Sequence, residues 1–299
     1  MKGWKMGNTR ILTRSFDYFS PNSLTAVFEL FEKFGRNAVI VAGGTDVVPQ
    51  LKYEAISPAA LINIKKIPEL NYIKEENGLN IGATARLRDV EQFCAKSKDY
   101  VCLHDALSSI GKIQVMNMGT LAGNLCTASP AADSAPALLV MDGQVKLSSS
   151  KGDRVIGLKD FFQGPRKTVK VFDEIMTEVR IPPVREGVGS AFIKVARVGS
   201  DISKITCAVF VERQNDSCVS CKVSMGAVAA TPIRIFEAES MLENKKVTEA
   251  LLDKAGELIG LLIQPMSDVR STETYRRQIA KILFYDTFQK AWKRTGGEI

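Results

Sequence analysis

An uninterrupted apolar segment that runs into a pair of glycines is the feature that most constrains the fold of this chain. Val39, Ile40 and Val41 are successive β-branched residues, which is typical of a buried strand. Gly43 and Gly44 follow, and glycine lets the backbone turn with positive φ and bring its amides close to a ligand. Successive amides of this kind form a concavity that suits an anion such as a pyrophosphate. By itself, the segment is equally consistent with an ordinary tight turn at the end of a strand.

A second glycine-bearing loop lies well downstream of the first. It has the sequence Gly-Thr-Leu-Ala-Gly-Asn at 119–124, and it leads into Ser-Pro-Ala-Ala-Asp at 129–133. Two loops of this type can hold the two halves of a dinucleotide, whereas one loop alone is weak evidence for such a ligand. The pair therefore favours a dinucleotide site over two unrelated turns.

Both loops and their surroundings resemble the FAD-binding subunit of the molybdenum hydroxylases, a family that includes xanthine dehydrogenases, carbon monoxide dehydrogenase and aromatic N-heterocycle hydroxylases. The similarity covers nearly the whole chain. The shared motifs, in order, are Phe-Asp-Tyr-Phe-Ser-Pro at 16–21, Ala-Gly-Gly-Thr-Asp at 42–46, Ile-Gly-Ala-Thr-Ala-Arg at 81–86, Gly-Thr-Leu-Ala-Gly-Asn-Leu at 119–125, Ala-Ser-Pro-Ala-Ala-Asp-Ser-Ala-Pro at 128–136, Ser-Asp-Val-Arg at 267–270 and Tyr-Arg-Arg at 275–277. One position departs from the pattern, because Ala122 stands where the family usually has the first glycine of a pair. We expect a slightly altered loop geometry there and retained binding.

The resemblance implies that FAD binds non-covalently along both loops. Backbone amides and the Thr45 hydroxyl would receive its pyrophosphate, and Asn124 would bridge a phosphate or ribose to the loop backbone. The contact residues implied in the two loops are Val39, Ile40, Val41, Ala42, Gly43, Gly44, Thr45, Asp46, Gly119, Thr120, Leu121, Ala122, Gly123 and Asn124. Outside a cofactor site, Asn124 would be a turn-stabilising amide.

The family pattern also implies contacts outside the loops. It places Asp133 on the adenosine side of FAD, as a hydrogen-bond partner of a ribose hydroxyl, although this carboxylate could equally complement the N-terminus of a helix. Ile110, Ile175 and Ile193 fall where residues line the flavin or adenine, and each could equally be an ordinary core residue. Lys194 belongs to a segment that approaches the isoalloxazine ring in this family. A cation at that place would stabilise the negative charge of a reduced flavin.

Two charged residues follow Lys194 in the same segment. Arg197 and Asp201 lie around the expected position of the ring, where either could act on the flavin. Their spacing is equally consistent with a simple salt bridge between them. The sequence leaves both interpretations open.

Composition limits the class of protein. The 299 residues are 45% hydrophobic and 24% charged, which is enough for two domains with well-formed cores. No segment approaches the roughly 20 apolar residues of a membrane span, and the basic segment 1–10 lacks the apolar stretch of a signal peptide. The six cysteines lack the spacing of a disulfide framework, which predicts free thiols in a reducing cytoplasm.

Charge and metal-ligand patterns point away from other functions. The net charge of +7 is spread along the chain, and its densest cluster, at 275–294, indicates a solvated helix face rather than a nucleic-acid site. Cys218 and Cys221 have a metal-site spacing, but residues three apart on the strand expected there point to opposite faces. His104 is the only histidine, which argues against Ser-His-Asp, Cys-His and His-metal chemistry.

Hydrophobic periodicity predicts an α+β chain with two domains. The resemblance implies a two-part FAD-binding domain of the covalent-flavin (PCMH) type at 10–183, then a smaller domain of the CO dehydrogenase flavoprotein type at 187–295 with a three-stranded antiparallel sheet and helices. We expect Thr84 to cap the helix that follows it and the 130–140 helix to point its N-terminus at the ligand. The expected helices lie at 24–34, 84–93, 102–112, 130–140, 233–242, 248–263 and 271–293, the strands at 38–42, 61–64, 144–147, 174–181, 190–196, 207–213 and 218–229, and a hairpin at 72–82.

The resemblance predicts the FAD-binding, electron-transfer subunit of a cytoplasmic, xanthine dehydrogenase-like molybdenum hydroxylase. Substrate would be oxidised at a molybdopterin centre on a large subunit, and electrons would pass through 2Fe-2S clusters of a small subunit to this FAD. The flavin would then reduce NAD or another acceptor. Two alternatives stay open: a self-sufficient flavin-dependent oxidase, which Cys126 beside the second loop keeps in view, and a scaffold subunit that has lost FAD.

Overall fold

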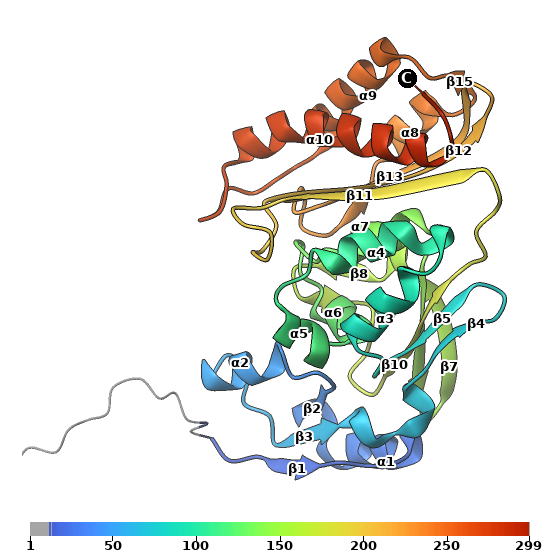
Figure 1. Cartoon of the computed structure of the whole chain (residues 1–299). Helices are drawn as coiled ribbons and strands as arrows, with labels where there is room; N and C mark the ends of the chain where they lie inside the picture. Colours follow the sequence, from blue (N-terminus) through green and yellow to red (C-terminus); the bar gives the residue numbers. More distant parts are fainter. Residues whose placement is uncertain (1–11, 13, 299) are drawn as a thin grey trace, which may run out of the picture.

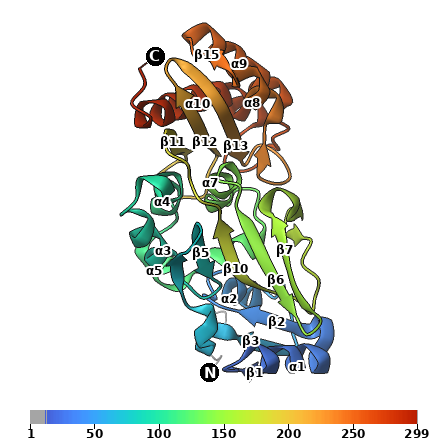
Figure 2. The same ribbon diagram turned by 90° about the vertical axis from the view of Figure 1, so that its right-hand side faces the viewer.

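The computed structural model describes residue 12 and residues 14–298, so the basic segment 1–10 lies outside the described residues. Its described residues form three larger sheets stacked along the long axis of the molecule, with helices between and beyond them, and a fourth sheet of two short strands (Figures 1 and 2). The first sheet is parallel, in the order β1-β3-β2, and carries the first glycine loop at the end of β2. The elements of this layer are β1 (Asp17–Phe19), α1 (Leu24–Phe34), β2 (Ala38–Val41), α2 (Val47–Lys52) and β3 (Ala60–Asn63).

Local sequence explains why α1 has these ends. The hydroxyl of Ser23 accepts a hydrogen bond from the backbone amide of Ala26, which satisfies one of the free amides of the first turn. Gly35 follows the last residue with φ of 54°, a conformation that glycine adopts without strain. Val27 and Phe31 are the buried positions of the helix, one turn apart. The helix therefore holds β2 in a fixed place, and β2 in turn fixes the glycine loop.

The second sheet is antiparallel, in the order β4-β5-β10-β6-β7, and helices cover it on the side of the third sheet. Its first hairpin turns at Asn77 and Gly78, which have φ of 53° and 103°. This turn confirms the hairpin expected at 72–82. The elements of this layer are β4 (Ile73–Glu75), β5 (Leu79–Gly82), α3 (Leu87–Cys94), α4 (Val101–Ser108), α5 (Ile113–Met118), α6 (Leu121–Thr127), α7 (Ser134–Val140), β6 (Gln144–Ser149), β7 (Gly152–Gly157), β8 (Phe162–Gly164), β9 (Lys167–Thr168) and β10 (Ile175–Ile181).

The third sheet is antiparallel and lies between two sets of helices (Figure 1). One face packs against the helices that follow it, with Ala191 and Cys207 in their core. The opposite face packs toward α4 and α7, with Phe192 and Ala208 in the larger core of the preceding layers. Burial on both faces explains the long apolar runs in these strands. The elements are β11 (Val188–Val195), β12 (Ile205–Gln214), β13 (Ser217–Gly226), β14 (Ile233–Arg234), α8 (Phe236–Leu242), β15 (Lys245–Lys246), α9 (Glu249–Leu262) and α10 (Glu273–Arg294).

The ion pairs that join residues 14–181 to residues 188–298 all have the same polarity. In each pair found among the described residues, the earlier part of the chain supplies the carboxylate and the later part supplies the cation. The pairs are Asp105 with Lys290 and Arg294, Asp133 with Lys194, and Asp142 with Lys222 and Arg234. Much of the basic cluster expected as a solvated face of α10 is thus engaged with carboxylates.

The expected α+β fold is confirmed, and several local expectations were wrong. Thr84 does not cap α3, because that helix begins at Leu87 and the Thr84 hydroxyl is buried without a partner. The helix expected at 102–112 ends at Ser108, and the one expected at 130–140 begins only at Ser134. Two short strands, β14 and β15, extend the three-stranded sheet. β7, β8 and β9 were not expected, because short strands rich in charge and glycine lack a hydrophobic alternation.

The sequence indicated that the two cysteines of β13 point to opposite faces of the strand, and this expectation was wrong. Arg213 pairs with Cys218 while Glu212 pairs with Ser220, so β13 carries one extra residue at this place. This bulge brings Cys218 and Cys221 to the same side of the strand, where both are buried in one core and the Cys218 thiol donates to the Ser220 carbonyl at 3.4 Å. Among the described residues, no group of three or more metal-ligating side chains is present.

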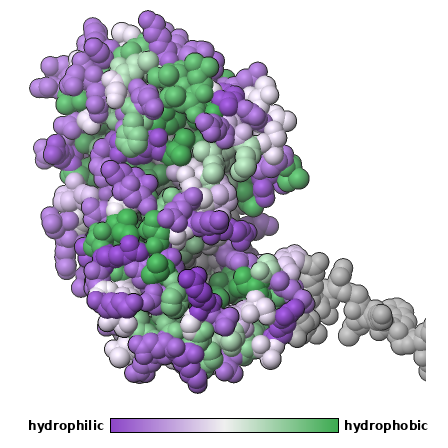
Figure 3. Space-filling view, turned by 180° about the vertical axis from the view of Figure 1, so that it is seen from behind, coloured by the Kyte–Doolittle hydropathy of each residue, from purple (hydrophilic) through white to green (hydrophobic). Residues whose placement is uncertain are grey.

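The surface shows no extended apolar band on the face turned away from Figure 1. Figure 3 shows hydrophobic residues there in separate patches, divided by hydrophilic ones. Within residues 12 and 14–298, no helix combines the length and the hydropathy that crossing a bilayer requires.

Candidate functional site

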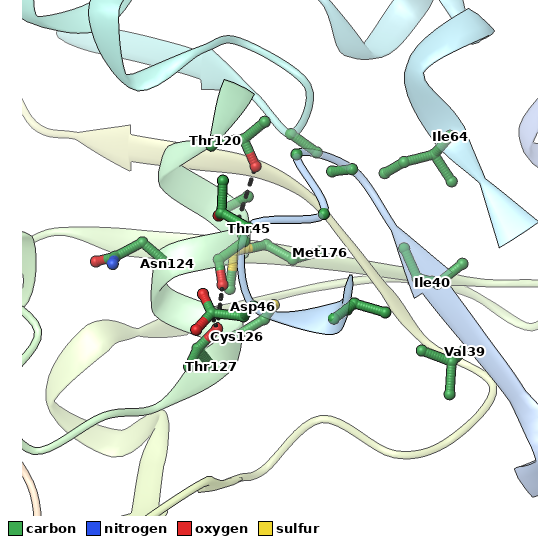
Figure 4. A pocket seen from close by; sticks show the side chains of 18 of the residues that line it. Val39, Ile40, Thr45, Asp46, Ile64, Thr120, Asn124, Cys126, Thr127 and Met176 are labelled. Atoms are coloured by element: carbon green, nitrogen blue, oxygen red, sulfur yellow. Dashed lines mark hydrogen bonds between the residues drawn. The ribbon is translucent and has the colours of Figure 1, made fainter. Parts of the chain in front are cut away.

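The two glycine loops meet at a cavity of about 410 Å³ between the first sheet and α6 (Figure 4). Ligand sites commonly have volumes of roughly 300–1,000 Å³. Most residues that the sequence indicated line this cavity. They are Val39, Ile40, Ala42, Gly43, Gly44, Thr45, Asp46, Ile110, Gly119, Thr120, Ala122, Gly123, Asn124 and Ile175.

The two loops are in direct contact through their backbones. A Cβ atom on Gly43 would overlap the carbonyl oxygen of Met118 and lie 2.6 Å from the Cα atom of Gly119. Gly44 is constrained differently, because its φ of 74° is one that residues with a side chain rarely adopt. The sequence predicted that both glycines are needed for a positive φ and for close approach of the backbone. In the structure, close approach requires glycine at position 43, and positive φ favours glycine at position 44.

The first loop presents free backbone donors to the cavity. Among the described residues, the amides of Gly43, Gly44, Thr45 and Asp46 donate to no other protein group. Unpaired amides are rare in folded proteins unless solvent or a ligand satisfies them. Four successive free amides beside a cavity therefore provide the anion-binding arrangement that the glycines suggested.

The second loop begins helix α6, and its side chains connect it to the first loop. The Thr120 hydroxyl accepts a hydrogen bond from the Gly123 amide at 3.1 Å and caps the helix. The Thr127 hydroxyl, at the other end of α6, donates to the Asp46 carboxylate at 3.2 Å. This bond is a dashed line in Figure 4. Asn124 accepts a hydrogen bond from the Ser134 hydroxyl at 2.6 Å. The Thr127–Asp46 bond therefore joins α6 to the first loop, and the other two bonds stabilise the second loop and the segment after it.

Five expected contact residues lie outside the cavity lining, namely Val41, Leu121, Asp133, Ile193 and Lys194. Val41 completes strand β2, and Leu121 is fully buried in the core. Ile193 packs against the core formed by the third sheet and its helices. We expected the helix at 130–140 to point its N-terminus at the ligand. The helix, α7, begins at Ser134, and neither Ser134 nor the residues before it in 130–133 line the cavity.

Asp133 and Lys194 bind each other across the boundary between the second and third layers. The Lys194 ammonium donates to Asp133 and to the carbonyl of Ser109, both at 2.8 Å, and Ser203 donates to the second carboxylate oxygen. The two side chains are 9% and 6% exposed. Burial raises the pKa of Asp133, and the attraction of Lys194 opposes that rise. Arg197 and Asp201 form an exposed salt bridge at 2.7 Å, in line with the simpler interpretation of that pair.

Sequence reasoning missed one wall of the cavity. This wall comes from the segment after β8 and the start of β10, and contributes Arg166, Lys170, Phe172, Glu174 and Met176. It contains no glycine loop and no strong periodicity, so no local pattern marks it as part of a site. Its position follows from the packing of β10 against β5 and β6.

Cys126 lines the cavity from α6, which bears on covalent attachment of a flavin. Burial raises the pKa of this thiol to about 11, although the nearby Lys170 ammonium opposes the rise. A thiol with a raised pKa is mostly protonated near neutral pH and is therefore a poor nucleophile. This chemistry disfavours the covalent-flavin alternative.

Known proteins resemble this chain along nearly its full length. Residues 14–184 match the model of the FAD binding domain in molybdopterin dehydrogenase, and residues 190–291 match that of the CO dehydrogenase flavoprotein C-terminal domain. The chain belongs to the family of FAD-binding medium subunits of molybdenum hydroxylases. It is accordingly an oxidoreductase subunit.

Individual relatives show how close the similarity is. The glyceraldehyde dehydrogenase medium chain of Sulfolobus acidocaldarius is 31% identical over 92% of this chain and 98% of its own. The nicotinate dehydrogenase FAD-subunit of Eubacterium barkeri is 30% identical over 92% and 95%. A chain in the structure of carbon monoxide dehydrogenase from Hydrogenophaga pseudoflava superimposes with a TM-score of 0.91 at 28% identity, covering 95% and 99%.

The residues present fit FAD. The free amides of residues 43–46 and the Thr45 hydroxyl offer donors for a pyrophosphate. Ile110 and Ile175 offer apolar surface for an aromatic ring on the same cavity. Ala122 lines the cavity as a buried residue of α6, so its methyl group is accommodated in the helix.

Proposed function

We propose that this chain is the electron-transfer subunit of a cytoplasmic molybdenum hydroxylase. The two glycine loops would hold FAD, which would supply electron transfer between 2Fe-2S clusters on a small partner subunit and NAD or another acceptor. Oxidation of the substrate would belong to a molybdopterin centre on a large partner subunit. The observation that carries the proposal is the contact between the two glycine loops, which gathers free amides at one cavity.

The names of the relatives support the division between subunits. One is a medium chain and another an FAD-subunit, so each is one component of a larger enzyme. Their enzymes are named for glyceraldehyde and nicotinate, so the substrate differs between relatives whose FAD subunits are similar. We infer that the substrate of this complex depends on the large subunit. The free state of all six cysteines supports a reducing cytoplasm.

This chain's residues have defined tasks in the proposal. The loop amides bind and orient the pyrophosphate, and the apolar wall that includes Ile110 and Ile175 excludes water from the ring. We propose that Asp133, Lys194 and Ile193, which lie outside the cavity lining, complete the contact set, as the family pattern implies. We also propose a division into an FAD-binding domain at 10–183 and a C-terminal domain at 187–295.

Three measurements test this proposal. The purified chain should contain one FAD that acid or heat releases intact, and it should pass electrons from NADH to a dye if NAD is the acceptor. It should also co-purify from cells with a large molybdopterin protein and a small 2Fe-2S protein. Substrate turnover by the isolated chain would favour the self-sufficient oxidase, and a folded, colourless chain would favour the scaffold.

A further inference from the structure

The cavity wall has an uneven distribution of charge. Within the described residues, its acidic side chains are Asp46 and Glu174, and its cations are Arg166 and Lys170. Glu174 is already neutralised, because Arg154 donates to both its carboxylate oxygens at 2.5 and 2.7 Å. The two cations have no such partner, since no carboxylate of the described chain lies within ion-pair distance of either.

Lys170 is held in place by the segment around it. Its ammonium donates to the carbonyls of Val171 and Glu174 at 3.2 and 3.1 Å. The Val171 amide donates to the Glu174 carboxylate at 2.9 Å, so the Arg154–Glu174 pair also fixes this turn. Two backbone carbonyls orient the ammonium, and the Glu174 carboxylate, whose pKa Lys170 helps to lower, is itself paired with Arg154. Lys170 lines the cavity, and its charge also opposes the rise in the pKa of the Cys126 thiol on the same wall.

Arg166 lines the same wall of the cavity. Its amide donates to the carbonyl of Ala128 at 2.9 Å, which places it beside the end of α6. The preceding residue of α6, Thr127, lies 3.2 Å from Asp46 of the first loop. Arg166 has φ of 59°, so an arginine occupies a backbone conformation that would suit glycine.

The two glycine loops provide no full positive charge to balance the negative charge of a diphosphate. Residues 42–46 and 119–124 contain no cation, and Asp46 adds a carboxylate of the same sign as a phosphate. Backbone amides supply only partial positive charge to a dianionic diphosphate. A cation elsewhere on the cavity wall would add the full positive charge that the two loops lack.

We propose that Lys170, assisted by Arg166, supplies this counter-charge and makes the site selective for a diphosphate-bearing flavin over one that lacks phosphate. The proposal deepens the FAD-binding function and rests on it. Lys170 and Arg166 are binding and specificity residues, and neither is required for the chemistry of the flavin ring.

The test compares three ligands on the full chain after acid removal of its flavin. FAD carries the diphosphate and the ring, ADP carries the diphosphate without the ring, and riboflavin carries the ring without phosphate. Lys170→Met should weaken FAD and ADP about tenfold, which corresponds to about 1.4 kcal/mol, and leave riboflavin unchanged. Raising KCl to about 0.5 M should reduce the difference between the variant and the wild type, because salt screens the charge.

Two further variants control for folding and for general charge effects. Lys167→Met removes the same charge from an exposed residue of β9 that is absent from the cavity lining, and should change FAD affinity less than twofold. Arg166→Gly removes the second cation while relaxing the backbone, so the chain should stay folded and bind FAD about threefold more weakly. Lys170→Arg should restore most of the affinity.

Two results would overturn the inference. One is a Lys170→Met variant that binds FAD as tightly as Lys167→Met does. The other is an equal loss of riboflavin and FAD affinity, which would assign Lys170 to the ring or to folding. A wild-type chain that binds none of the three ligands would instead refute the FAD function itself, and the inference with it.

Discussion

The contact between the glycine loops makes unequal predictions for two adjacent glycines. On Gly43, an added methyl group would overlap the carbonyl of Met118 and stand 2.6 Å from the Gly119 Cα, where ordinary contact begins at 3.4 Å. Both neighbours are backbone atoms, so no side chain can move aside. The loops must separate by about 1 Å, and losing two hydrogen bonds to a charged pyrophosphate, at roughly 1.5 kcal/mol each, costs about 100-fold in affinity. We therefore expect Gly43→Ala to lower FAD affinity at least 100-fold.

Gly44→Ala should have a much smaller effect. The nearest atoms to its new methyl group would be side-chain carbons of Val48 and Val41, at 3.4 and 3.5 Å, which is ordinary contact. Only the φ of 74° is unfavourable, and that costs about 1–2 kcal/mol for alanine. If alanine adopts this φ only when FAD is bound, the full 1–2 kcal/mol reduces the binding free energy, and FAD binds about 5- to 30-fold more weakly.

Flavin fluorescence titration of the flavin-free chain measures both effects, and thermal melting checks the fold. Gly35→Ala is the matched control, because its φ of 54° carries the same kind of strain at the end of α1 and nothing lies within 4 Å of the new methyl group. It should lower the melting temperature and leave FAD affinity unchanged. Equal affinities for Gly43→Ala and Gly44→Ala would refute the argument that loop contact, rather than φ, governs the first glycine.

Three other perturbations have expected outcomes. Lys194→Met should lower the free energy of unfolding by about 3 kcal/mol, because it leaves the Asp133 carboxylate buried and unpaired, and adding Asp133→Asn should recover part of the loss in denaturant titrations. Burial raises the pKa of Asp105, but hydrogen bonds from Arg294 and Lys290 prevail and hold it below its usual value of about 3.9. Its contribution to stability is therefore present above about pH 4 and is lost as the pH falls through the lower folded value, so Asp105→Asn should flatten the acid limb of the stability curve. Cys126→Ser should retain FAD that trichloroacetic acid releases completely, and flavin that stays with precipitated wild-type chain would contradict the non-covalent assignment.

The sequence predicted the loops well because their constraints are local. A β-branched run at 39–41 followed by two glycines encodes both the strand and the turn within a few residues. Likewise, Asn77 and Gly78 encode a hairpin by their own φ preferences, whatever surrounds them. The family pattern then added the second loop, although contact between the loops depends on tertiary packing.

Features that depend on distant partners were missed or misjudged. Lys170 looks like an unremarkable charged residue, and only the packing of β10 brings its segment to the cavity. Thr84 precedes α3 at a spacing typical of a cap, but the chain continues for two more residues before the helix begins. Cys218 and Cys221 lie on the same side of β13 because a bulge interrupts the alternation of the strand. A regular period in the sequence gives no sign of that interruption.

The uniform polarity of the ion pairs between the two parts of the chain has a consequence for the cavity. In these pairs the carboxylate always lies on the earlier part of the chain and the cation on the later part, so the charges that meet at the boundary are complementary. Asp133 is the one of these carboxylates that is almost fully buried, and it lies nine residues beyond Asn124 of the second loop. Ser134, its neighbour, donates to Asn124 at 2.6 Å. The position of the third sheet is therefore linked through α7 to the loop that we assign to FAD, by hydrogen bonds and one buried ion pair.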